Sequence, residues 1–351
     1  MTKFAVVGLG YWGPNLLRNL VANAGGAQVV AVDQSVDRLA ETCAHYPTVA
    51  CASSLEQALD EHDIGGVLIA TPVSTHHHLA RTALDAGCHV LVEKPLAAST
   101  EEAEDLVTSA EAARRTLMVG HTFLFSPRVD LIHELVTHGR LGNIQYVTSA
   151  RLNLGLHQAD VSVIWDLAPH DLSIIFHILG EFPETVRTSG RAVVHTDRPD
   201  VAFITLTFPS GVVALVSISW LAPSKARNMV VVGDEQMLVY DDIDNEQPIK
   251  LYDKGVIRPE PGNFGEHQLI YRHGDMLAPH VVAQEPLARE VAHFLACAAG
   301  VQMCRCDGWF GLGVVRVLEA AERSWNLGGD AVPLAPLGGE PRPTIERTRI
   351  A

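Results

Sequence analysis

The stretch FAVVGLGYWG, from Phe4 to Gly13, decides the fold of this chain. Its apolar first half is typical of a buried strand, and Gly8, Gly10 and Gly13 then form the pattern G-x-G-x-x-G. In this context the first glycine permits a tight turn and the second lets the backbone approach a pyrophosphate. The third lets the following helix pack closely, and the start of that helix carries partial positive charge. The stretch therefore predicts a dinucleotide-binding unit.

An acidic residue, Asp33, ends the next apolar segment, QVVAVD, 20 positions after Gly13. A carboxylate here accepts hydrogen bonds from the adenosine ribose and repels a 2′-phosphate, so the expected cofactor is NAD rather than NADP. Tyr11 and Trp12 in the glycine turn are also expected to bind it. Arg38 either flanks the adenine or lies on a helix surface. A plain glycine turn followed by an unrelated Asp is the alternative, and the combination of strand, spacing and acid counts against it.

Apolar strand-like segments alternate with amphipathic helix-like segments over residues 1–121. Continuous apolar strands between such helices indicate a parallel sheet that is covered on both faces, as in a Rossmann domain. Further strands are expected at 28–33, 66–72, 88–95 and 116–122, and helices at 14–24, 36–45, 77–86 and 100–115.

Residues 122–328 have a different pattern, with longer strand-like segments such as IQYVTSARLNL and VVALVSISW and few helices between them. This pattern predicts an α+β domain with an open, mostly antiparallel sheet, within an α/β chain overall. Helices are expected at 165–179, 286–299 and 309–327, and the last two could pack back on the first domain. The segment 253–284 could be a substrate lid, an oligomer contact or a variable surface excursion. Residues 329–351, rich in Pro and Gly, are expected to be an extended tail.

Polar residues follow two of the expected parallel strands. Thr71 and Pro72 end one strand, and Glu93, Lys94 and Pro95 end the next. In a doubly wound sheet the ligand lies beyond the carboxyl ends of the strands, so Glu93 and Lys94 are expected at the crevice. A surface lysine that reaches solvent from a loop is the alternative for Lys94.

The segment WDLAPHD, residues 165–171, places Asp166 and His170 four positions apart inside an apolar run. This spacing puts both side chains on one face of a helix. Removal of a hydride from an alcohol carbon requires a base for the hydroxyl proton, and imidazole has an ordinary pKa near neutrality. By itself, the segment favours the alternative, an Asp that caps a helix and a histidine in the core.

These features together resemble the Gfo/Idh/MocA family, named after glucose–fructose oxidoreductase and inositol dehydrogenase. The resemblance covers roughly residues 3–328 and rests on GLGYWG, Asp33, ATPVSTHHHLA, EKPLA, GHTFLFSP and WDLAPHD. It implies a Rossmann domain followed by a domain whose open sheet often forms homodimers or homotetramers. It also implies that Lys94, Asp166 and His170 surround the substrate carbon. The cofactor residues that it implies, beyond the glycine turn, are Asp33, Thr71, Pro72, His76, Glu93, Lys94 and His121.

The resemblance further implies an NAD-dependent dehydrogenase that oxidises a ring hydroxyl of a sugar. The form of GHTFLFSP and WDLAPHD is similar to a subgroup acting on nucleotide-linked or glycosidic sugars, with C3 as the expected carbon. His170 is the expected base and Lys94 its partner. A cationic aminosugar or a cyclitol is the alternative substrate, and a non-catalytic NAD-binding sensor is the alternative of another class. A sugar diphosphate would need cations, which the second domain offers at Arg128, Arg151, Lys225 and Arg227.

The composition excludes some classes of protein. A net charge of −15 argues against a nucleic-acid partner, because phosphates would be repelled. No apolar run reaches the about 18 residues that span a bilayer, so no membrane partner is expected. The six cysteines form no C-x-x-C pair, which indicates reduced thiols and a cytoplasmic protein. No metal site is expected: His76, His77 and His78 cannot all face one ion, and Cys304-x-Cys306 has no apparent partner cluster.

Overall fold

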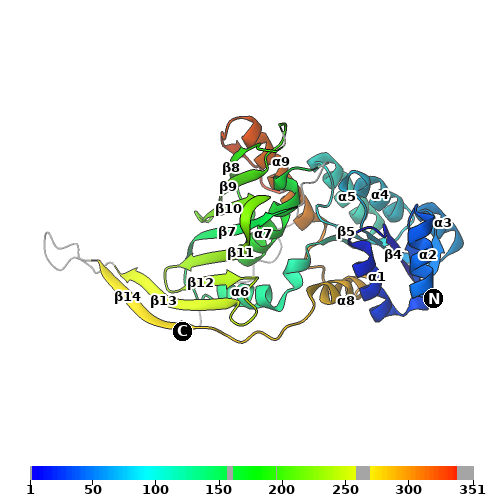
Figure 1. Cartoon of the computed structure of the whole chain (residues 1–351), viewed down its shortest axis with the longest axis horizontal. Helices are drawn as coiled ribbons and strands as arrows, with labels where there is room; N and C mark the ends of the chain where they lie inside the picture. The colour runs from blue at the N-terminus through cyan, green and yellow to red at the C-terminus, as the bar shows by residue number, and fades with distance from the viewer. Residues whose placement is uncertain (1, 156–160, 195, 258–268, 338–351) are drawn as a thin grey trace. The chain divides into compact units, whose positions relative to one another are not determined.

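A computed structural model describes residues 2–155, 161–194, 196–257 and 269–337. The chain divides into two compact units (Figure 1). Unit 1 contains Met1–Ser126 and Gln284–Glu319, and unit 2 contains Pro127–Ala283 and Ala320–Ala351. The sequence pattern places a boundary after residue 121, and the structure in addition groups a returning segment near the C-terminus with unit 1.

Unit 1 contains a six-stranded parallel sheet in the order β3-β2-β1-β4-β5-β6. This is the doubly wound order of a Rossmann domain, as expected. Its strands are β1 (Lys3–Val7), β2 (Val29–Val32), β3 (Ala50–Ala52), β4 (Ile64–Ile69), β5 (His89–Glu93) and β6 (Leu117–Gly120). Its helices are α1 (Gly13–Ala24), α2 (Val36–His45), α3 (Leu55–Glu61), α4 (His76–Asp85), α5 (Thr100–Ala113), α8 (Pro286–Ala298) and the first part of α9 (Gly308–Asn326). Three short 3₁₀ helices are η1 (Gly26–Gln28), η2 (Val73–Thr75) and η3 (Thr122–Phe125).

Serine residues begin three of the helices in unit 1. The side chains of Ser35, Ser54 and Ser99 each accept a hydrogen bond from the backbone N–H three positions later. Such a cap satisfies an N–H group that has no partner inside the helix. These caps fix where α2, α3 and α5 begin, and the fully buried residues of β2 and β6 supply the core between the layers.

Unit 2 contains a nine-stranded sheet in the order β14-β13-β12-β11-β7-β10-β9-β8-β15. Among its described strands only β7 and β10 pair in parallel, so the expected mostly antiparallel sheet is confirmed. The strands are β7 (Ile144–Leu154), β8 (Thr185–Arg191), β9 (Val201–Thr207), β10 (Val213–Ser219), β11 (Leu221–Gly233), β12 (Met237–Asp241), β13 (Ile249–Ile257), β14 (Ile270–Leu277) and β15 (Val332–Pro333). Helix α7 (Val163–Leu179) packs on β10, and α6 (Pro127–Thr137) packs on α7.

A buried ion pair holds α7 on the sheet of unit 2. Asp171 accepts hydrogen bonds from Arg151 Nε at 2.6 Å and from Ser149 Oγ at 2.7 Å. Both donors lie on β7, and all three side chains are buried. Because each charge is compensated and hydrogen-bonded, loss of either partner would leave a buried unpaired charge. The pair therefore fixes the rotation of α7 about its own axis.

The three interpretations of the segment 253–284 stay predictions, and one other expectation needs correction. The segment 253–284 contains most of β13 and all of β14, which pair with each other, although residues 258–268 lie outside the described residues. Cys43 and Cys51 are joined by a disulfide, so the expectation of six reduced thiols is wrong for these two. In the described part of the chain, no helix is long and apolar enough to cross a membrane.

The glycine turn predicts a sharp difference between two substitutions. A Cβ at Gly13 would lie 1.8 Å from the carbonyl oxygen of Gly8, whereas a Cβ at Gly10 would meet nothing within 4 Å. We expect Gly13→Ala to lower the free energy of unfolding by about 1–3 kcal/mol, because backbone has to move. Gly10→Ala is the matched control and should stay within about 0.5 kcal/mol of wild type. Urea unfolding measures both, and equal stability of the two variants would contradict the packing described here.

Candidate active site and cofactor site

The turn between β1 and α1 presents backbone rather than side chains to a ligand. Gly8 has a φ of 91°, a conformation that favours glycine, and its N–H donates to Val32 O at 2.8 Å. The space around Gly10 is open, and the Tyr11 side chain is 95% exposed. A pyrophosphate can therefore approach the turn closely at Gly10, as the glycine pattern predicts.

Asp33 links this turn to the second strand. Its Oδ2 accepts from the Leu9 N–H at 2.6 Å and its Oδ1 from the Ser35 N–H at 2.8 Å, while Arg38 Nη1 lies 3.5 Å from Oδ2. Asp33 is 8% exposed. A carboxylate has about four acceptor positions, so these contacts leave capacity for ribose hydroxyls. The geometry fits the adenosine half of NAD.

Buried ionisable groups gather where β5 and β6 end. Burial raises the pKa of Glu93 to about 7, although the positive charge of Lys94 opposes this shift. Burial, and then the charge of Lys94, lowers the pKa of His121 to about 3, so its ring is neutral. Among the described residues, neither ring nitrogen of His121 has a hydrogen-bond partner. Unsatisfied buried polar atoms are costly, and a bound polar group would satisfy them.

Glu290 on α8 completes this group and was missed by the sequence analysis. Thr122 Oγ1 donates to Glu290 Oε2 at 2.7 Å. Burial, and then repulsion from Glu93, raises the pKa of Glu290 well above its ordinary value. The sequence does contain a signal that could have identified Glu290, because this residue shares an apolar helix face with Leu287, Val291 and Phe294. A charged residue on such a face marks a polar site inside the core.

His76 connects two loops that carry predicted site residues. It is buried, with Nδ1 2.9 Å from Pro95 O and Nε2 2.9 Å from Thr71 O. Burial lowers its pKa. The ring thereby joins the loop after β4 to the loop after β5. The neighbouring His77 lies 2.8 Å from Asp105, so His76 and His77 have different partners.

In unit 2, α7 carries Asp166 and His170 on one half-buried face. Ser162, not Asp166, is the residue that immediately precedes the first turn of the helix. Asp166 Oδ2 accepts a hydrogen bond from Trp220 Nε1 at 3.0 Å. Trp165 is buried instead, and its Nε1 donates to Glu322. A capping role for Asp166 is therefore excluded.

Comparison with known proteins identifies the family. Residues 2–121 match the model of an oxidoreductase family with an NAD-binding Rossmann fold, and residues 129–239 match the GFO/IDH/MocA C-terminal domain. UDP-N-acetylglucosamine 3-dehydrogenase of Acidithiobacillus ferrooxidans is 31% identical over 91% of this chain and 95% of its own length. The chain belongs to the Gfo/Idh/MocA oxidoreductase family. It is thus an oxidoreductase with an NAD-binding domain, as its motifs imply.

Solved structures agree with this assignment. A crystal form of the same Acidithiobacillus enzyme superposes with a TM-score of 0.77 at 27% identity, covering 92% of this chain and 96% of that one. GenD2 from gentamicin A biosynthesis, solved with NAD, has a TM-score of 0.78 at 23% identity and shows the same fold. It covers 95% of this chain and 97% of its own.

Two sequence predictions about charged and metal-ligating groups are wrong. Arg151 cannot serve a sugar diphosphate, because it forms the buried ion pair with Asp171. The cysteine at position 304 does have a partner cluster, which consists of His293 and Cys297. The sequence signal for this cluster is the spacing of four positions between His293 and Cys297, on one face of a helix.

The buried carboxyl pair predicts how stability depends on pH. The folded-state pKa of Glu93 and of Glu290 is raised, so the folded chain binds more protons than the unfolded chain above about pH 4.5, and stability falls as pH rises toward and past 7. Glu290→Gln removes one buried carboxyl group and, with it, the electrostatic repulsion that acts on Glu93. We expect the variant to exceed wild type in free energy of unfolding by about 1–3 kcal/mol at pH 8 and by less at pH 5.

Urea unfolding at the two pH values tests this expectation. Glu104→Gln, on the exposed face of α5, is the matched control and should show the same difference from wild type at both pH values. A Glu290→Gln variant whose difference from wild type is the same at pH 5 and pH 8 would contradict a raised pKa in the folded state.

Proposed function

We propose that this protein is an NAD-dependent dehydrogenase that oxidises a ring hydroxyl, at C3, of a nucleotide-linked sugar to a keto sugar. The observation that carries the proposal is the 31% identity, along 91% of this chain, to an enzyme named for 3-dehydrogenation of UDP-N-acetylglucosamine. The chain has the residues that such a reaction needs, namely a cofactor turn, Lys94, and the pair Asp166 and His170.

Residues of unit 1 would hold the cofactor. The backbone at Gly10 receives the pyrophosphate, and Asp33 accepts hydrogen bonds from the adenosine ribose. The loops after β4, β5 and β6 bind the nicotinamide half; their site residues are Thr71, Pro72, Glu93, Lys94 and His121. When bound, NAD supplies the hydride acceptor.

His170 and Lys94 divide the work on the reacting hydroxyl. His170 takes up the hydroxyl proton as the hydride leaves the carbon, so the alcohol becomes a carbonyl without formation of a free alkoxide. Lys94 donates a hydrogen bond to the same oxygen, and its positive charge stabilises the negative charge that develops there. Asp166, held by Trp220, positions His170 or an adjacent sugar hydroxyl.

A non-catalytic NAD-binding sensor would need the glycine turn and Asp33 only. It would have no use for Lys94, Asp166 and His170, which count against it. Among the cations of unit 2, Arg128 and Arg227 both lie 3.6 Å from carboxylate oxygens of Asp242. With Arg151 excluded, these two arginines and the exposed Lys225 are the candidates for a diphosphate contact.

The proposed enzyme is a homo-oligomer, a homodimer or a homotetramer. The support is the face of the large sheet opposite α7, where strands β7, β9 and β10 expose large apolar side chains. Tyr146, Phe203, Val213 and Leu215 are 39–46% exposed on these strands. Contiguous apolar surface of this kind marks interfaces between proteins.

NADH formation against a panel of substrates tests the reaction. UDP-sugars, dTDP-sugars, aminoglycoside intermediates, free inositol and free hexoses are offered with NAD, and we expect turnover with a nucleotide-linked sugar. His170→Asn should lower kcat by about 10²–10⁴-fold, because proton transfer in the transition state is lost. Lys94→Ala should lower kcat by about 10²–10³-fold, because the charge that stabilises the developing negative oxygen is lost. If only aminoglycoside intermediates are turned over, the substrate is a cationic aminosugar and not a nucleotide-linked sugar. Full activity of either variant would refute its assigned role, and NAD binding with no turnover at all would favour the sensor.

Asp33 predicts a separate loss in cofactor affinity. Asp33→Ala should weaken NAD binding by about tenfold or more, since hydrogen bonds to a charged group contribute about 1.5–3 kcal/mol. The same substitution should reduce the discrimination against NADP, because the repulsion of the 2′-phosphate is gone. Titration of each nucleotide into the wild type and the variant measures both effects. Asp37→Ala, in the first turn of α2, is the control, and unchanged NAD affinity in Asp33→Ala would refute the role.

A further inference from the structure

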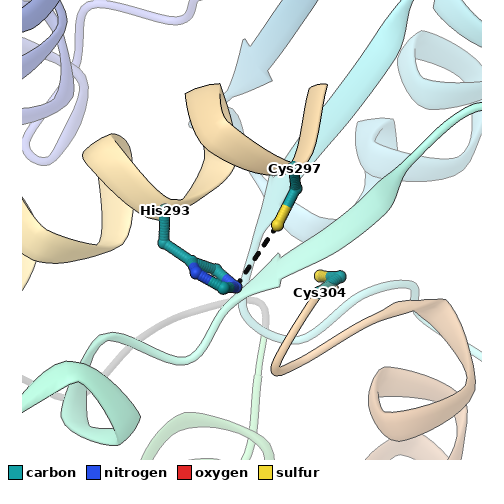
Figure 2. Close-up of side chains that lie close together, drawn as sticks. All are labelled: His293, Cys297 and Cys304. Atoms are coloured by element: carbon teal, nitrogen blue, oxygen red, sulfur yellow. Dashed lines mark hydrogen bonds between the residues drawn. The ribbon is translucent and has the colours of Figure 1, made fainter. Parts of the chain in front are cut away.

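Three side chains that the proposed reaction does not use meet within unit 1: those of His293, Cys297 and Cys304 (Figure 2). One ring nitrogen of His293 and the two sulfur atoms all lie within 4.8 Å of one another. His293 and Cys297 are on α8, and Cys304 is on the loop between α8 and α9. Figure 2 shows the imidazole and both sulfurs on the same side of α8.

The loop that carries Cys304 is fixed by hydrogen bonds to the sheet. Val119 N–H donates to Cys306 O at 2.9 Å, and the Cys306 thiol donates to Val119 O at 3.1 Å. Arg305 Nη1 also donates to Leu124 O at 2.5 Å. Gly300, with a φ of 71°, turns the chain after α8. The position of Cys304 opposite α8 is therefore set by the fold around it.

The hydrogen bonds of His293 direct one nitrogen toward the two thiols. Its Nδ1 lies 2.9 Å from Gln302 Oε1, an oxygen that can only accept, so Nδ1 carries the proton. Nε2 accepts a hydrogen bond from the Arg305 N–H at 3.1 Å and lies 3.3 Å from the Cys297 sulfur. A metal ion bound by Nε2 would take the place of the Arg305 N–H. A metal-binding histidine typically donates its other N–H to an oxygen in this way.

The two sulfur atoms of the cluster differ in burial, because Cys297 is buried and Cys304 lies partly at the surface. A divalent cation would replace the thiol protons and compensate two thiolates at once. Cys304 is half-buried, so an ion can reach the cluster from solvent.

We propose that His293, Cys297 and Cys304 form a zinc site that ties the loop before α9 to helix α8. One nitrogen and two sulfur ligands suit zinc, which is bound tetrahedrally by such donors, whereas magnesium and calcium prefer oxygen. Solvent takes the fourth position, because the Cys306 thiol is engaged by Val119. The site is independent of the proposed reaction, since none of its ligands takes part in it.

Titration with Co²⁺, a spectroscopic substitute for zinc, tests the proposal. The full-length protein is reduced, stripped with a chelator and titrated without oxygen. We expect one equivalent to bind with the absorption bands of a tetrahedral thiolate complex, and zinc, but not magnesium, to displace it. Cys297→Ser, Cys304→Ser and His293→Asn should each abolish these bands. Gln302→Ala, on an exposed side chain, should weaken binding by about 10–100-fold, because the histidine loses its orienting oxygen.

Cys88→Ser is the matched control for the loss of a thiol. Cys88 is buried in unit 1 with its sulfur 3.2 Å from Ile64 O, and its substitution should leave Co²⁺ affinity unchanged. Absence of saturable Co²⁺ binding by the wild type would overturn the proposal, as would wild-type affinity in Cys304→Ser. A Cys297–Cys304 disulfide formed on mild oxidation, in a protein that binds no Co²⁺ when reduced, would identify a redox pair instead.

Discussion

The close contact between the end of β1 and the start of α1 is the constraint on which the site depends. The carbonyl of Gly8 occupies the space that a side chain at Gly13 would need. Asp33 then accepts the Leu9 N–H from the same turn, so strand β2 is bound to it as well. The surface that this turn presents to a ligand is therefore made of backbone atoms. Their positions are fixed by the fold and do not depend on the choice of a side-chain rotamer. At this turn, the side chain of Asp33 would decide which nucleotide is accepted.

The polar groups beyond β5 and β6 differ from the glycine turn, because their burial lowers the free energy of unfolding. Glu93, Glu290 and His121 each contain a buried polar atom that lacks a partner among the described residues. The positive charge of Lys94 favours the ionised form of Glu93 and the neutral form of His121, so one lysine lowers the pKa of both groups. Groups with such shifted pKa values cluster at functional sites. Their arrangement is explained by the ligand they would bind and not by folding.

Much of the fold could be predicted from the sequence, because the apolar residues of each long element have a clear spacing and recognisable residues mark where the element begins. The glycine turn, the helices near 36–45 and 286–298, and the change to an antiparallel sheet are of this kind. Strand β3 and helices α3 and α6 were missed; β3, with three residues, is too short to show a period. The partners of Arg151 and Cys304 were also missed. Such contacts join segments far apart in sequence, and they depend on tertiary packing rather than on local pattern.

The segment 284–319 returns to unit 1 late in the chain, and several separate contacts hold it there. A chain that leaves a unit and comes back has to close a long loop, which costs entropy. Glu285 accepts from Arg18 Nη1 at 3.2 Å and from Asn19 Nδ2 at 3.1 Å, which fixes the start of α8 on α1. Thr122 and Glu290 fix its middle. A zinc ion at His293, Cys297 and Cys304 would act only after these contacts, on the loop that follows. Its loss should therefore loosen the connection to α9 and leave the attachment of α8 to the cofactor site in place.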